Sequence, residues 1–404
     1  MLTVMEALRL IRDAVRPVPA EVVSLDQAWG RVLATDVEAR LTHPPVAVSA
    51  MDGYAVRSAD VTTVPATLSV VGAAAAGQGV TRTLGRGEAV RILTGAPVPD
   101  GADAIVIQED AELAGDHVTV RAAPKLGRFI REAGLDFKSG DRLLKAGQAL
   151  SARDVALCAA MNVPWLTVRR RPRVAVLATG SELRMPGEPL DGSRIVNSNS
   201  FLVASAVRAL GGEPLALGIA ADEEASLRAA FEAAAGADLL ITLGGASVGD
   251  RDLVRPVLLQ EGGTVTFQNL AMRPGKPTLF GRLGLLPVLG LPGNPVSLGV
   301  AAVVFLKPML AALAGLDRAF DQEETALLGR ALPANDGRQD YLRSTLALDA
   351  SGNQVATPYP QQDSAMLHIL AAADCLVIRP PHAPPAPAGE PVPILRFDTA
   401  GPAV

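Results

Sequence analysis

Apolar residues recur at helical spacing near the start of the chain. This predicts an amphipathic helix with an apolar face made of Val4, Leu8, Ile11 and Val15. Thr3 and Glu6 stand three residues apart, as in a capping box at the first turn of a helix. Pro17 ends the pattern, since proline cannot continue a helix. We assign residues 1–44 and 141–171, which contain this helix and several extended segments, to an N-terminal α+β linker domain.

The period of the apolar pattern shortens between residues 45 and 140, where Gly and Val are frequent and strand-like segments alternate with turns. These segments are Thr67–Val71, Glu88–Leu93, Ala104–Gln108 and His117–Arg121. The segments before and after differ in character, so we interpret residues 45–140 as a β-rich domain inserted into the N-terminal domain.

From residue 172 onward, short apolar runs alternate with amphipathic segments. Strands are predicted at Val174–Ala178, Leu215–Ala220, Leu239–Leu243 and Leu285–Leu291, and helices at Ser198–Leu210, from Asp222, at Val254–Gln260 and from Val296. Two-sided apolar strands that alternate with helices are typical of a doubly wound parallel sheet. Residues 172–328 are therefore expected to form an α/β domain, and residues 329–404 a small C-terminal β domain. The expected fold class is multidomain α/β plus β.

Composition narrows the classes of function. The 404 residues carry a formal net charge of −5, which argues against a general nucleic-acid binder. The basic run Arg169–Arg173 is interpreted as a solvated linker. Lys307 and Pro308 interrupt the apolar run Val296–Leu306, which is too short for a bilayer that needs about 20 residues, so no membrane span is expected.

The cysteines and histidines suggest no metal site. Cys158 and Cys375 match no metal-binding spacing and are expected to be buried free thiols, which fits a cytoplasmic protein. The four histidines form no cluster in the sequence. Neither a histidine-based metal site nor a Ser-His-Asp triad is therefore indicated.

Four polar turns follow predicted strands of the α/β domain: Thr179–Glu182, Asp222, Gly244–Asp252 and Gly290–Ser297. The carboxyl ends of the strands in such a sheet share one edge, where ligands bind. A glycine turn after a strand is usually only a turn, but four polar turns at one edge favour a site. Gly244–Asp252 adds carboxylates to glycines, which suggests phosphate together with a divalent cation. Of its two acids, Asp250 and Asp252, the first is expected to cap the next helix.

The turn Met272–Pro277 presents two cations, Arg273 and Lys276, on a backbone that proline and glycine restrict. Such a turn can hold an oxyanion, although a hairpin with exposed charges is an equal alternative. In the β-rich domain, Ser49–Val56, Thr94–Pro97 and Gly134–Asp136 join polar side chains to glycine turns. Taken alone, these three segments favour ordinary hairpins.

Together these segments resemble the molybdopterin molybdenumtransferase family, which includes the E domain of gephyrin. Its motifs occur here in family order, with Met51–Ala55 and Leu291–Ser297 the most specific. The resemblance implies a four-domain homodimer in which the α/β domain of one subunit faces the β-rich domain of the other. It further implies that the protein inserts molybdate into adenylylated molybdopterin and releases AMP. The reaction would use a divalent cation, usually Mg²⁺, as cofactor.

The resemblance also implies roles for individual residues. The implied catalytic residues are Asp52, Thr94, Asp136, Glu182, Asp222 and Asp252, of which Asp252 and Glu182 would bind the metal. The implied substrate-binding residues are Gly180, Ser181, Gly244, Gly245, Ser247, Arg273, Lys276, Pro292, Gly293, Asn294, Pro295 and Ser297. Ser181 and Ala246 depart from the commonest residues of the family, but neither change removes a carboxylate.

Two other functions remain open at this stage. A molybdopterin adenylyltransferase has an α/β fold similar to residues 173–328, but it needs neither the additional domains nor the Ser49–Val56 segment. A separate molybdopterin adenylyltransferase is instead a candidate partner of this protein. A non-catalytic scaffold is the second alternative, and the full set of acidic residues argues against it.

Overall fold

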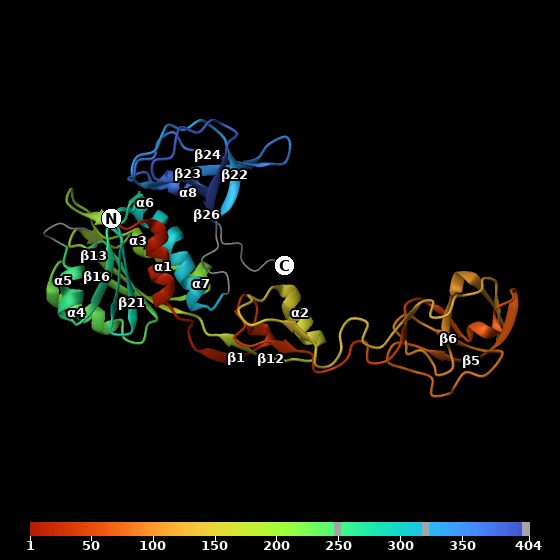
Figure 1. Cartoon of the computed structure of the whole chain (residues 1–404). Coiled ribbons are helices and arrows are strands. Elements are labelled where there is room, and N and C mark those ends of the chain that lie inside the picture. Colours follow the sequence, from red (N-terminus) through yellow and green to blue (C-terminus); the bar gives the residue numbers. More distant parts are fainter. Residues whose placement is uncertain (246–251, 317–322, 398–404) are drawn as a thin grey trace. The chain divides into compact units, whose positions relative to one another are not determined.

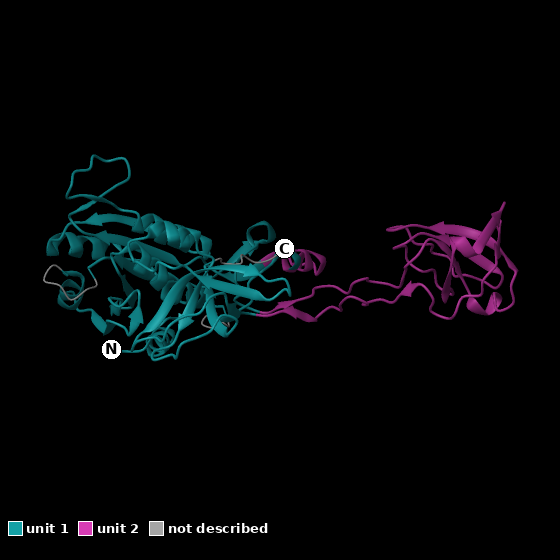
Figure 2. Ribbon diagram, turned by 90° about the horizontal axis from the view of Figure 1, so that it is seen from above, with its two compact units in different colours: residues 1–35, 146–153, 166–404 teal, residues 36–145, 154–165 magenta. Residues whose placement is uncertain are grey.

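The computed structural model describes residues 1–245, 252–316 and 323–397. The chain divides into two compact units, drawn in different colours in Figure 2. Unit 1 comprises residues 1–35, 146–153 and 166–404, and unit 2 comprises residues 36–145 and 154–165. The boundaries of the four domains expected from the sequence stay a prediction.

The α/β part of unit 1 contains a six-stranded sheet. Its order is β16 (Glu213–Ala220), β13 (Arg173–Thr179), β17 (Leu239–Leu243), β21 (Leu286–Leu291), β20 (Leu279–Leu283) and β18 (Thr264–Gln268). The first four strands are parallel, and β20 and β18 extend the sheet in antiparallel fashion. The four parallel strands are the four predicted ones, whereas the antiparallel pair was not predicted.

Helices cover both faces of this sheet (Figure 1). α1 (Val4–Ala14) and α3 (Asn199–Ala209) share one core with Val174 and Val176 of β13. α4 (Glu224–Ala233) and α5 (Val254–Gln260) pack on the opposite face, in a core that contains Ala175 and Leu177. Successive residues of β13 thus enter opposite cores, as period-two side-chain alternation requires. This confirms the doubly wound α/β fold.

The helix that begins after β21 extends beyond the apolar run Val296–Leu306. α6 (Pro295–Ala301) continues through a π-helical segment (Ala302–Leu306) into α7 (Lys307–Leu313), so Lys307 and Pro308 interrupt the apolar run but not the helix. Proline lacks the N–H that an α-helix interior uses, and the wider π-helical turn before it absorbs the mismatch. By length and composition this 19-residue helix could cross a membrane, yet 78% of its most apolar window is buried inside the protein. A core helix has the same properties.

A second six-stranded sheet of unit 1 holds the C-terminal strands. Its order is β19 (Met272–Arg273), β23 (Gln339–Leu348), β24 (Gln354–Pro358), β22 (Glu324–Leu328), β26 (Pro391–Arg396) and β25 (Cys375–Arg379), and α8 (Leu367–Ala372) lies between β24 and β25 in sequence. β19 belongs in sequence to the α/β part, so its pairing with β23 joins the Arg273 turn directly to the C-terminal sheet.

Unit 2 is built around a third six-stranded sheet. Its order is β7 (Ala104–Ile107), β4 (Gly53–Val56), β6 (Glu88–Ile92), β5 (Ala66–Ala74), β9 (His117–Val120) and β8 (Ala111–Ala114). The four strands predicted for this region are all present, as β5, β6, β7 and β9. Shorter pairs join β3 (Val48–Ser49) to β10 (Ile130–Arg131), and β2 (Val37–Glu38) to β11 (Arg142–Leu144).

Three smaller expectations have clear outcomes. The capping box at α1 is formed by Thr3 and Glu6, and both cysteines are buried and free, as predicted. The basic run is only partly the solvated linker that was expected, since Arg171 and Arg173 are exposed but Arg170 is paired. Arg170 donates two hydrogen bonds of 2.6 Å to the carboxylate of Asp238, and the pair fastens the start of β13 to the loop before β17. The chain also forms β1 (Ala20–Ser24), which pairs with β12 (Trp165–Arg169), and the helix α2 (Ala152–Ala160).

Candidate functional site

A cavity of about 590 Å³ lies at the carboxyl ends of β13, β17 and β21 in unit 1. It is lined by seven residues that the sequence singled out: Gly180, Glu182, Asp222, Gly244, Gly245, Pro292 and Gly293. Its other walls are largely apolar and include Leu227, Leu243 and Val254. A concave, mostly apolar pocket with a few converging polar groups is the usual form of a small-molecule site.

The glycines of this cavity are required by their geometry. Gly180 has φ of +142°, and a Cβ there would lie 2.7 Å from the carboxylate of Glu182. Gly245 has φ of +63°, and a Cβ there would lie 2.5 Å from Val254. Only glycine adopts both turns without strain. The backbone is therefore open to a ligand at these positions.

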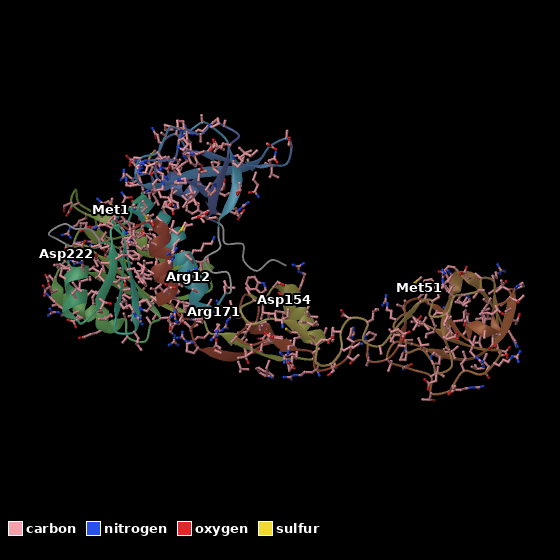
Figure 3. The ribbon with its side chains drawn as sticks, in the orientation of Figure 1. Met1, Arg12, Met51, Asp154, Arg171 and Asp222 are labelled. Carbon is pink, nitrogen blue, oxygen red and sulfur yellow. The ribbon has the colours of Figure 1, made fainter. Side chains whose placement is uncertain are left out.

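Asp222, labelled in Figure 3, is fastened to the turn after β13. Its carboxylate accepts a hydrogen bond of 3.0 Å from the Ser181 N–H, and its own N–H donates to the Ser181 hydroxyl at 3.2 Å. The expected helix start at Asp222 was wrong by two residues, since α4 begins at Glu224. The side chain crosses to the neighbouring strand end instead of capping its own helix.

The carboxylate of Asp252 has no counter-charge among the described residues. Both of its carboxylate oxygens are buried without a hydrogen-bond partner of normal geometry in the described parts of the chain. Burial raises the pKa of Asp252 to about 7, and the nearby Val254 N–H offsets only part of that effect. Leu253 and Val254, the next two residues, line the cavity. Ser247 and Asp250, also singled out by the sequence, lie outside the described residues.

The two cations of the Met272–Pro277 turn have different surroundings. Arg273 pairs with Asp336 at 3.0 Å and with the buried Asp340, so its charge is already compensated. These carboxylates raise the pKa of Arg273. Lys276 is exposed and has no ion pair in the described part of the chain, and its neighbour Pro277 lines the cavity. Only Lys276 is free to meet an anion.

The loop that begins α6 is also anchored to the segment between β24 and α8. The Asn294 side chain caps the helix by accepting from the Val296 N–H at 3.2 Å, and its amide donates to the Ser364 hydroxyl at 3.3 Å. Pro295 occupies the first helical position, and Ser297 follows in the first turn. These residues fix the loop whose Pro292 and Gly293 form the cavity wall.

The remaining candidates lie in unit 2. The Asp52 carboxylate, one residue after the labelled Met51 of Figure 3, accepts hydrogen bonds of 2.7 Å from both the N–H and the hydroxyl of Thr94. The Thr94 N–H, then its hydroxyl, lower the pKa of Asp52. Asp136 is exposed, and its N–H donates to the His43 carbonyl at 3.1 Å.

Two further polar residues have unpartnered side-chain atoms among the described residues, and the sequence analysis did not single them out. Arg343 is 1% exposed and forms no ion pair among the described residues; its guanidinium donates to Gln362 and to the Met366 carbonyl, and Nη2 has no partner. Burial lowers its pKa. Asn199, at the start of α3, lines the cavity with an unpartnered side-chain oxygen. Neither residue lies in a glycine- or acid-rich motif, so nothing in the local sequence marks it.

Family models match three consecutive parts of the chain. The MoeA N-terminal region (domain I and II) matches residues 2–162, the probable molybdopterin binding domain matches residues 175–312, and the MoeA C-terminal region (domain IV) matches residues 325–397. Most of the chain, including both units, is therefore covered.

Curated relatives and solved structures agree with these matches. The molybdopterin molybdenumtransferase of Nostoc sp. is 38% identical over 81% of this chain and 77% of its own length. Molybdopterin molybdenumtransferase 2 of Mycobacterium tuberculosis is 37% identical over 93% of this chain and 95% of its own. Two crystal structures of the molybdopterin biosynthesis MoeA protein from Pyrococcus horikoshii are 30% and 27% identical. They match with TM-scores of 0.85 and 0.84 over 99% and 98% of this chain and all of theirs. The chain belongs to the molybdopterin molybdenumtransferase family and is a transferase of molybdenum cofactor biosynthesis.

Proposed function

We propose that this transferase inserts molybdate into adenylylated molybdopterin, with Mg²⁺-dependent cleavage of the adenylate and release of AMP. The observation that supports this most strongly is the carboxylate of Asp252, which is next in sequence to the cavity-lining Leu253 and whose buried oxygens have no hydrogen-bond partner among the described residues. Burying a carboxylate without a counter-charge is unfavourable. A divalent cation at this position would compensate the charge and lower the pKa of Asp252 again.

The donor set fits Mg²⁺ rather than a metal held by protein alone. Mg²⁺ is usually bound by one or two carboxylates, water and substrate phosphates. Asp252 and Glu182 would supply the carboxylates, and the described residues contain no group of three His, Cys, Asp or Glu side chains that could hold a metal without substrate. When bound, Mg²⁺ would offset the charge that develops on the leaving phosphate oxygen.

The chain's own residues would bind and orient two anionic substrates. Lys276 is an exposed cation next to the cavity-lining Pro277 and has no ion pair among the described residues. It can hold an oxyanion such as molybdate or phosphate through charge-assisted hydrogen bonds. The backbone at Gly244 and Gly245 leaves room for a phosphate to approach. Asp222 would keep the Ser181 turn in place while the substrate binds.

Asp52, Thr94 and Asp136 are proposed to be functional on the strength of the family resemblance. The Thr94 hydrogen bonds keep Asp52 ionised, which suits a carboxylate that positions a donor group or a cation. The resemblance also supports a homodimer, a cytoplasmic location and delivery of the substrate by a molybdopterin adenylyltransferase.

The decisive experiment measures AMP released from purified adenylylated molybdopterin with molybdate and Mg²⁺. AMP should appear with both present and should fall to background when EDTA replaces Mg²⁺. Tungstate, titrated in parallel, reports the choice of oxyanion. If the protein instead accumulates adenylylated molybdopterin from molybdopterin and MgATP, it is an adenylyltransferase. Absence of both reactions in folded protein would leave the scaffold as the better explanation.

A further inference from the structure

Asn199 is the first residue of α3 and lies in the wall of the cavity. Its side-chain amide donates a hydrogen bond of 2.7 Å from Nδ2 to the carbonyl oxygen of Gly293. A carbonyl oxygen can only accept, so this contact fixes which end of the amide is the nitrogen. The other end, Oδ1, is therefore an acceptor, and it is buried without a hydrogen-bond partner in residues 1–245, 252–316 and 323–397.

Oδ1 of Asn199 does not cap the helix α3. The start of α3 is served by Asn197, whose Oδ1 accepts from the Ser200 N–H at 3.2 Å and whose Nδ2 donates to the Ser200 hydroxyl at 2.9 Å. Buried side-chain acceptors are almost always satisfied in folded proteins. An acceptor held in place by one hydrogen bond and left open on its other side fits a donor group on a ligand.

The surroundings narrow the chemistry of that donor. Leu183, Leu227 and Leu243 give the cavity apolar walls suited to a flat ring, while the carboxylates of Glu182 and Asp222 disfavour electron-rich acceptors nearby. A ring that carries an exocyclic amino group satisfies both conditions, because its faces are apolar and its N–H groups only donate.

We propose that Oδ1 of Asn199 reads an exocyclic amino group of the substrate, and that the Gly293 contact holds the amide for this purpose. The inference rests on the proposed function, in which the cavity binds adenylylated molybdopterin. Adenine and pterin both carry such an amino group, and the two arms of the test distinguish them. Asn199 is thus a specificity-determining residue that neither the motifs nor the acidic residues indicate.

The test compares the dissociation constants of four probes by calorimetry: AMP against IMP, and pterin against lumazine. In each pair an amino group is replaced by an oxo group. The unmodified protein should prefer the amino member of one pair by about tenfold, since one hydrogen bond is lost and an acceptor faces Oδ1. A preference for AMP identifies adenine as the group that is read, and a preference for pterin identifies the pterin ring.

Two variants separate recognition from mere support of the Gly293 loop. Asn199→Leu removes both the donor and the acceptor. It should bring the ratio of the two dissociation constants in each pair close to one. Asn199→Asp keeps an acceptor but loses the donor, so it should bind every probe more weakly and still prefer the amino member. Asn353→Ala, in the turn between β23 and β24, is the matched control and should leave the preference unchanged.

The proposal is overturned if the unmodified protein shows no preference in either pair, or if Asn199→Leu retains it. Loss of the preference in Asn199→Asp to the same degree as in Asn199→Leu would equally contradict it. These readouts are binding ratios and need no turnover. A failure of AMP release would therefore refute the proposed reaction while leaving the recognition by Asn199 measurable.

Discussion

Asp52 of unit 2 and Asp252 of unit 1 are the two carboxylates that the sequence marks most clearly, and their surroundings are opposite. Asp52 is half-buried, and one of its oxygens receives two hydrogen bonds of 2.7 Å from Thr94. Asp252 is also half-buried, but neither of its oxygens has a hydrogen-bond partner among the described residues. The pKa of Asp52 is lowered by its hydrogen bonds, whereas burial raises the pKa of Asp252 to about 7.

The difference teaches what each carboxylate needs. Asp52 is complete within its own turn, because Thr94 supplies the donors that a carboxylate requires. Asp252 is incomplete in the folded chain and gains the most from a cation. The same contrast separates the neighbouring cations, since Arg273 is paired with two carboxylates while Lys276 has none among the described residues.

The largest effect is expected from Asp252→Asn. A catalytic metal contributes several kcal/mol to transition-state stabilisation, so AMP release should fall by about 100- to 1,000-fold. Asp52→Asn keeps an acceptor oxygen for Thr94, and its loss should be closer to tenfold. Initial rates at saturating Mg²⁺ measure both. A larger loss for Asp52→Asn than for Asp252→Asn would reverse the comparison.

The next largest effect concerns the two cations. Lys276→Met should raise the KM for molybdate by about 10- to 100-fold, as expected for one charge-assisted hydrogen bond. Arg273→Met should act mainly on thermal stability, because it leaves the buried Asp340 without its counter-charge. Molybdate titrations and melting curves separate the two outcomes. Equal changes in KM would show that Arg273 also contacts the anion.

The smallest effect is a shift of stability with pH. The folded pKa of Asp252 is raised, so its carboxyl favours folding at low pH, and this contribution is lost as pH rises from about 4 to about 7. Asp252→Asn should therefore melt about 1–3 °C above the unmodified protein at pH 8 without metal, and at the same temperature near pH 4. Mg²⁺ at pH 8 should stabilise the unmodified protein and not the variant.

Asp52 provides the opposite case for that measurement. Its folded pKa is lowered, so its contribution is present above the unfolded pKa and is lost as pH falls through the folded pKa. Asp52→Asn should leave the Mg²⁺-dependent shift at pH 8 unchanged. If Asp52→Asn abolished that shift as Asp252→Asn does, the metal would depend on both carboxylates equally.

Individual helices and strands show which parts of the fold could be predicted from the sequence. β17 (Leu239–Leu243) and α5 (Val254–Gln260) match their predicted bounds, because two-sided burial and helical periodicity are written directly into side-chain polarity. β18 and β20 were not predicted, since they extend the sheet through antiparallel pairing that no local pattern marks. The sequence predicted a helix from Val296 without an end, and the helix continues past Pro308 because a π-helical segment accommodates the proline.

By itself, the sequence determined the alternation of strands and helices, the order of the polar turns and the family. These depend on residue type and spacing, which the chain carries locally. Only the tertiary structure decided which charges are compensated: Arg273 meets Asp340, 67 residues away, Asp52 meets Thr94, and Asn199 meets Gly293. Hydrogen bonds act over about 3 Å between groups that the fold brings together, so no local pattern could predict that Asp252 and the oxygen of Asn199 would find no partner in the described part of the chain.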